Sequence, residues 1–151
     1  MKRIWLIVFV LVSVFTSCKS DDDTPLPENT TFVKAQVDAS AWEATSFKAS
    51  YINNIVSIEA NRSDGTTIDI SVQNVSDIGD YTLGNVSIGV YEEGSGNDET
   101  YTTSGTLGSG TINFSVLKSD RVEGTFSFDG GNGLGNSKSI SNGVFKINAA
   151  N

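Results

Sequence analysis

VSIEANRSDGTTIDISV, residues 56–72, is the stretch that decides the fold of this chain. Apolar residues alternate with polar ones on both sides of Ser63-Asp64-Gly65, and such alternation is typical of a strand with one buried face. Asp-Gly between two alternating runs is a strong signal for a β-hairpin. We therefore predict two antiparallel strands here, with their apolar side chains facing a common core.

The same period of two recurs after residue 31, between turns rich in Gly, Asn, Asp and Ser. The further strands that we expect are residues 32–37, 46–51, 79–83, 86–91, 109–116, 123–128 and 140–147. Eight to ten short strands at this spacing predict an all-β fold, either an antiparallel β-sandwich or a small β-barrel. The pattern leaves the choice between the two open, and we expect almost no helix.

Some connections between these strands have a clear local signal. Residues 38–42 are expected to turn the corner after the first strand, and Asn53-Asn54 is a natural turn pair. Gly124 lies inside an expected strand, where a glycine often marks a bend or a close approach of two backbones. Residues 130–135 are rich in glycine and are expected to form the most flexible loop.

The N-terminal residues predict a destination for the protein. Lys2-Arg3 precedes an apolar run at residues 4–15, which is the arrangement of a secretory signal and is too short to span a bilayer. Phe15-Thr16-Ser17-Cys18 resembles the lipobox of bacterial lipoproteins, which implies lipidation of Cys18 and cleavage before it. The alternative is a plain secreted protein cut later, for instance after Ser20, with one leftover thiol.

Five residues follow the cysteine and resemble the export signal of Bacteroidetes surface lipoproteins. These residues are Lys19, Ser20, Asp21, Asp22 and Asp23. The resemblance implies a lipid anchor in the outer membrane, with the protein on the cell surface. The alternative is a solvated acidic tether on the periplasmic face. The expected division is a signal peptide at 1–17, a lipidated Cys18 with its tether to residue 30, and one domain at 31–151.

The remainder of the chain has motifs of its own. Val37-Asp38 leading to Trp42, residues 124–128 (GTFSF) and residues 141–145 (SNGVF) resemble a family of uncharacterised lipoproteins from the same bacterial group. The resemblance covers most of residues 32–148. It implies a β-rich domain of unknown function and supplies no catalytic residues.

Composition excludes several classes of function. Removal of residues 1–17 leaves 8 basic and 18 acidic residues, a net charge of −10, so the chain lacks the basic face that nucleic-acid binding needs. It also has no histidine and a single cysteine that is assigned to lipid, which excludes Ser-His-Asp and Cys-His catalysis and the usual zinc sites. We expect a protein that is not an enzyme and needs no cofactor or metal.

Three polar features have a possible chemistry that we weigh against a plain structural role. Glu59 and Asp69 could form a carboxylate pair, but the alternation places them on the solvent side, where solvated carboxylates are expected. Residues 133–139 lack the glycine that a phosphate-binding loop has before its lysine, and they lead into a strand. The acidic loop at 92–99 offers oxygen ligands for calcium without a recognised spacing, which favours a solvated loop.

Four aromatic residues complete the candidate sites: Trp42, Tyr81, Tyr91 and Tyr101. They could form a stacking surface for a glycan or a protein ligand, although core packing is favoured for Trp42. The leading hypothesis is a lipid-anchored module that binds a glycan or a protein. The alternative is a lipocalin-like carrier of a small apolar ligand inside a barrel, and a hydrolase that uses carboxylates alone ranks last.

Overall fold

Antiparallel strands make up most of the part of the chain that a computed structural model describes, residues 30–94 and 99–149. The strands are β1 (Phe32–Val37), β2 (Ser40–Glu43), β3 (Ser46–Ile52), β4 (Ile55–Asn61), β5 (Thr67–Val72), β6 (Gly79–Leu83), β7 (Ile88–Glu92), β8 (Thr100–Thr102), β9 (Ser109–Leu117), β10 (Arg121–Gly131) and β11 (Ser137–Asn148). The all-β class is confirmed. The eleven strands exceed the expected eight to ten because the short strands β2 and β8 were not predicted.

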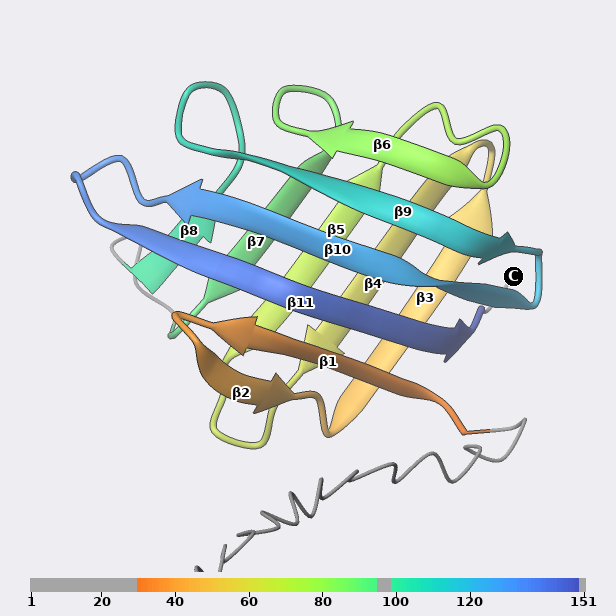
Figure 1. Cartoon of the computed structure of the whole chain (residues 1–151), viewed down its shortest axis with the longest axis horizontal. Helices are drawn as coiled ribbons and strands as arrows, with labels where there is room; N and C mark the ends of the chain where they lie inside the picture. The colour runs from red at the N-terminus through yellow and green to blue at the C-terminus, as the bar shows by residue number, and fades with distance from the viewer. Residues whose placement is uncertain (1–29, 95–98, 150–151) are drawn as a thin grey trace, which may run out of the picture.

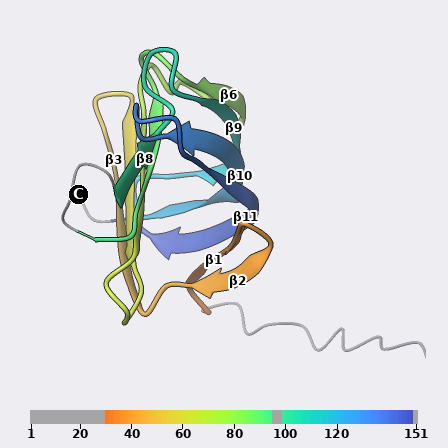
Figure 2. The same cartoon turned by 90° about the vertical axis from the view of Figure 1, so that its left-hand side faces the viewer.

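The strands form one sheet that curls into two layers. The front layer in Figure 1 has the order β6-β9-β10-β11-β1-β2, and the back layer has the order β8-β7-β5-β4-β3. Figure 2 shows the two layers edge-on, with the core between them. The layers join where Gly131 of β10 pairs with Thr102 of β8. On the other side the edge strand β3 meets the end of β11 through a bridge between Ala49 and Ala149. The result lies between a sandwich and a barrel.

The hairpin of β4 and β5 is antiparallel, as predicted, and Val56 lies opposite Val72. Its turn is closed by a hydrogen bond from the Arg62 amide to the Thr66 carbonyl, at 2.9 Å, and Gly65 supplies the positive φ of 91°. The preceding turn at Asn53-Asn54 also has positive φ at both residues, as a two-residue hairpin turn requires. These local signals explain why β3, β4 and β5 are sequential neighbours.

The inward side chains of both layers fill the space between them. The largest fully buried ones include Trp42, Phe114 and Phe145, and the last two rings meet edge to face at 5.9 Å. Gly124 lies opposite these rings, and a Cβ at this position would overlap the Asn113 carbonyl and come within 2.9 Å of the Phe145 ring. The predicted close approach at Gly124 is therefore confirmed.

Two predicted connections are wrong in their extent. The corner after β1 is only Asp38-Ala39, because the chain reverses there and Trp42 continues on β2 opposite Ala35. The loop expected at 130–135 is residues 132–136, because Gly130 and Gly131 continue β10 and pair with β11. Glycine in these two positions permits close contact with Tyr101 and Leu107 and does not mark a loop.

The predicted signal peptide, Cys18 and residues 19–23 lie outside the described residues, so their assignments stay predictions. Within the described ranges no helix is long and apolar enough to cross a membrane.

Candidate functional site

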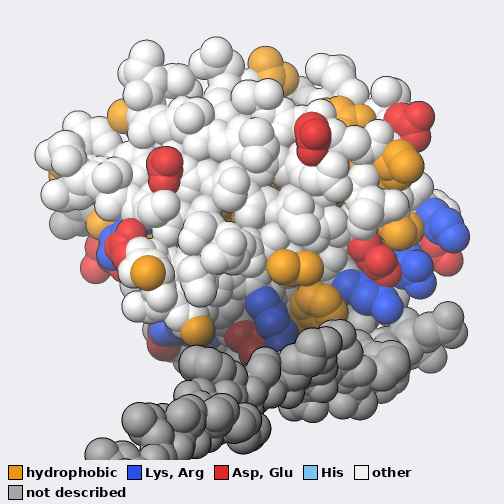
Figure 3. Space-filling model, viewed as in Figure 1, with side chains coloured by type: hydrophobic (Ala, Val, Ile, Leu, Met, Phe, Trp, Pro, Cys, Tyr) orange, Lys and Arg blue, Asp and Glu red, His pale blue; other side chains and the backbone are white. Residues whose placement is uncertain are grey.

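Mostly Ser, Thr and Asn side chains cover the middle of the outer surface of β6, β9, β10 and β11. We call this surface the polar face. Its polar side chains are Asp80, Thr82, Ser109, Thr111, Asn113, Thr125, Ser127, Asp129, Ser139, Ser141 and Asn142, and Arg121, Glu123, Val144 and Lys146 also lie outward on β10 and β11. In Figure 3 it faces the viewer as a largely white surface with isolated red carboxylates.

Strand pairing arranges these side chains in rows that cross the sheet. Thr82 lies opposite Thr111, which lies opposite Ser127. The neighbouring row joins Asp80 to Asn113 in the same way. Because adjacent strands are about 4.8 Å apart, each row presents hydrogen-bonding groups at nearly regular intervals.

Small side chains leave two depressions on the polar face, with volumes of about 430 and 420 Å³. The first is lined by residues of β6, β9, β10 and β11 that include Asp129, and the second by residues that include Asp80. Thr111 and Ser127 line both, so the two depressions are contiguous. Together they have the size of a small-molecule site.

Hydrogen bonds between side chains orient some of these groups before any ligand binds. The Asn113 amide donates to Asp80 Oδ1 at 2.8 Å across β9 and β6. The Asn142 amide donates to Gln36 Oε1 at 3.0 Å across β11 and β1. Groups fixed on paired strands lose little freedom on binding, which favours the capture of a ligand that carries several hydroxyl groups.

The family comparison covers this whole region. A profile described as "Domain of unknown function (DUF6252)" matches residues 29–147. The chain belongs to the DUF6252 family. No curated protein matches the chain, and no solved structure matches it. The function of this DUF6252 domain therefore has to be argued from its own geometry.

The four aromatic residues of the predicted stacking surface have structural contacts in the DUF6252 domain. Trp42, Tyr91 and Tyr101 are at most 7 % exposed. Tyr81 is half-buried, and its hydroxyl donates to the Asp77 carbonyl at 2.8 Å, as in the tyrosine corner of β-sandwiches. Their burial does not support a stacking platform and agrees with core packing of Trp42.

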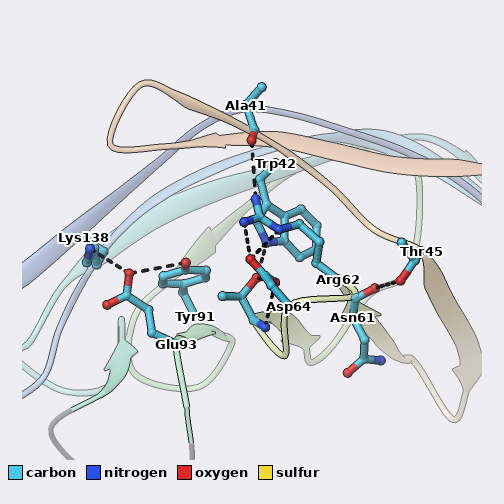
Figure 4. A network of polar contacts seen from close by, with 10 residues as sticks. Ala41, Trp42, Thr45, Asn61, Arg62, Asp64, Tyr91, Glu93 and Lys138 are labelled. Carbon is cyan, nitrogen blue, oxygen red and sulfur yellow. Dashed lines mark hydrogen bonds and ion pairs between the residues drawn. The ribbon is translucent and has the colours of Figure 1, made fainter.

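A polar network closes the end of the domain beneath Trp42 (Figure 4). Trp42 Nε1 donates to Thr66 Oγ1 at 2.8 Å, and Thr66 Oγ1 donates to Asp64 Oδ1 at 2.8 Å. Arg62 pairs with Asp64, and this pairing, followed by the hydrogen bonds from Thr66, lowers the pKa of the Asp64 carboxyl. Each polar group in this series of hydrogen bonds has a partner, so we assign a structural role to the network.

A second group of charges lies beside this network. Lys138 Nζ pairs with Glu93 at 2.8 Å and with Asp38 at 3.2 Å, and it lies over the Tyr101 ring. Glu93 belongs to the acidic loop that was weighed as a calcium site, so one of its possible ligands is paired with a lysine. Among the residues that the structure describes, no group of three or more acidic, His or Cys side chains could hold a metal ion, whereas residues 95–98 of the acidic loop lie outside them.

The prediction of two ordinary solvated carboxylates at Glu59 and Asp69 is wrong for Asp69. Glu59 is 46 % exposed and pairs with Lys48 at 2.8 Å, which lowers its pKa. Asp69 is half-buried, and burial, followed by the nearby Glu59 and Glu92, raises its pKa to about 6. A carboxylate-only hydrolase needs a pair of buried carboxylates, and Glu59 does not meet that requirement.

Sequence reasoning named no residue of the polar face as a candidate. The signal was present in the outward positions of the expected strands 79–83, 109–116 and 123–128, which are Ser, Thr, Asn and Asp except for Glu123. It was not visible as a site because β6 becomes the neighbour of β9 only through a long-range pairing, which sequence alternation does not specify.

Proposed function

We propose that this protein is a lipid-anchored, non-enzymatic module of the cell envelope that binds a neutral glycan on the polar face. The observation that carries the proposal is the contiguous pair of depressions, in which hydroxyl, amide and isolated carboxylate groups lie beside the apolar residues Phe126, Phe128, Ile140 and Val144. The anchor and the surface location rest on the resemblance of residues 15–23 to a lipobox and an export signal.

The chemistry of the polar face favours a neutral, hydroxylated ligand over other classes. An apolar ligand would remove water from the hydroxyl groups without replacing their hydrogen bonds. An anionic ligand would be repelled by the acidic chain. Protein interfaces are enriched in aromatic residues, Arg and Met, and of these the outward positions of β6, β9 and β10 carry Arg121 alone, at the start of β10. A sugar chain offers the alternating donors and acceptors that these positions need.

A packed interior does not favour the carrier alternative. A small apolar ligand requires a cavity of a few hundred Å³. Buried side chains occupy the space between the layers, and the two depressions of the polar face lie on an outer surface.

The predicted tether suits a binding role at the membrane. The chain from Cys18 to Thr31 spans at most about 45 Å when fully extended, so a lipid on Cys18 would still let the domain turn its polar face toward an extended glycan.

Binding is tested with Ser127→Arg in the chain from residue 18 that carries Cys18→Ser. Ser127 lines both depressions, so the long cation is expected to weaken binding of neutral polysaccharides, such as mannan, dextran and β-glucan, at least tenfold in affinity gels. The matched control is Ser115→Arg, on an exposed β9 position that lines neither depression. Equal retardation of both variants, or tighter binding of an anionic polysaccharide, would contradict the proposal.

The anchor is tested separately in cells. Cys18→Ala is expected to abolish acyl labelling and membrane retention, and protease shaving is expected to remove the wild-type protein from intact cells. Replacement of Asp21, Asp22 and Asp23 by Ala is expected to protect the protein by keeping it inside. Protection of both forms would place the domain in the periplasm.

A further inference from the structure

We propose that the depression on the outer face of β3, β4, β5 and β7 binds a protonated primary amine attached to a short aliphatic chain. This amine site lies on the layer opposite the polar face, and the inference does not depend on glycan binding. The depression has a volume of about 390 Å³.

Strand register builds the floor and one wall of the amine site. Ser50, Ser57 and Ser71 lie side by side in one row that ends at Ile88. Their small side chains form a low floor, because the next row contains longer groups. That next row runs from Lys48 through Glu59 and Asp69 to Val90. Ile88 and Val90 therefore give the site an aliphatic end beside Asp69.

Asp69 supplies the group that would hold the amine. Its Oδ1 atom is fully buried and has no hydrogen-bond partner within the described part of the chain. Buried polar atoms are nearly always hydrogen-bonded, so the Asp69 carboxylate has an unfilled acceptor position beside the depression that it lines. An ammonium group has three donors and no acceptor.

The charges around the site also favour a cation. Asp69 is faced by Lys48 from β3, Glu59 from β4 and Glu92 from β7. With Asp69 ionised, this group holds three carboxylates and one lysine, and that lysine pairs with Glu59. A bound ammonium would offset this excess of negative charge, while its aliphatic chain would cover Ile88 and Val90.

Free diamines and lysine side chains share this chemistry. The test titrates 1,5-diaminopentane and Nα-acetyl-lysine methylamide separately into the protein and follows backbone amide shifts by NMR. Binding of both would indicate recognition of the alkylammonium group itself. Binding of one alone would identify its source as a free polyamine or a lysine side chain. The neutral 1,5-pentanediol is expected not to bind.

Three variants give expected changes of different sign. Asp69→Asn should weaken amine binding at least tenfold, and Ser57→Leu should do the same by filling the floor from an exposed position. Lys48→Met should strengthen binding several-fold, because it removes the competing cation. Glu43→Gln, on β2 in the other layer, is a charge control and should leave the affinity unchanged.

The pH dependence adds a second readout. Protonation of Asp69 below its pKa of about 6 should weaken amine binding about tenfold between pH 7.5 and pH 5. The proposal would be overturned by equal affinities of wild-type and Asp69→Asn protein, by comparable binding of the diol, or by shifts that cluster away from β4, β5 and β7. It would also be overturned if neither amine bound.

Discussion

Asp69→Asn is expected to stabilise this protein at neutral pH. Burial and the neighbouring carboxylates raise the pKa of Asp69 from 3.8 to about 6, so the folded state binds the proton more tightly than the unfolded chain does. Ionised Asp69 therefore opposes folding. The penalty is absent below the unfolded pKa and complete above about pH 6, which is the reverse of the usual stabilising carboxylate.

The magnitude follows from the size of this shift. A difference of about 2 pKa units corresponds to about 3 kcal/mol, which we reduce to about 1–2 kcal/mol because Asp69 is only half-buried and water screens its charge. For a domain of this size, that gain corresponds to an increase in Tm of about 4–8 °C.

The assay is denaturant unfolding of wild-type and Asp69→Asn protein, from residue 18, at pH 7.5 and at pH 4. Trp42 is the one tryptophan after the predicted signal peptide, so its fluorescence reports on the core directly. The variant should be more stable at pH 7.5 and nearly equal to wild type at pH 4. Glu43→Gln removes an exposed partner of Lys34 and should change stability by less than about 1 kcal/mol. A stability gain that persists at pH 4, or no gain at pH 7.5, would refute the reasoning.

Three further outcomes can be checked with the same fluorescence. Gly124→Ala should destabilise the domain by about 2–3 kcal/mol, because the new methyl group overlaps the Asn113 carbonyl, whereas Gly84→Ala has open space and should have little effect. Thr66→Val removes the acceptor of the Trp42 indole and should cost about 1–2 kcal/mol, with a shifted emission maximum. Because Glu93 pairs with Lys138, 1 mM calcium should raise Tm by less than about 1 °C, and a larger rise would indicate a calcium site in the acidic loop.

The sequence by itself determined the strand content and the local hairpins. Asp64-Gly65 and Asn53-Asn54 act over a few residues, through backbone conformations that their own side chains permit, so they could be read without knowledge of the fold. A period of two also assigns each strand residue to one face, and in the expected strand 140–147 Phe145 and Ile147 are buried in this way. The predicted destination also depends only on a local N-terminal pattern.

Tertiary structure decided what each face of the sheet does. The polar face requires β6 to pair with β9 and β10 to pair with β11. The first of these pairings places Asp80 beside Asn113, which is 33 positions later in the chain. The sequence showed Asp69 as one more outward carboxylate, but its pKa depends on Glu59 and Glu92 from neighbouring strands and on burial among them. Alternation fixes the side of the sheet on which a residue lies, whereas long-range pairing fixes its neighbours, and those neighbours set its solvation and charge.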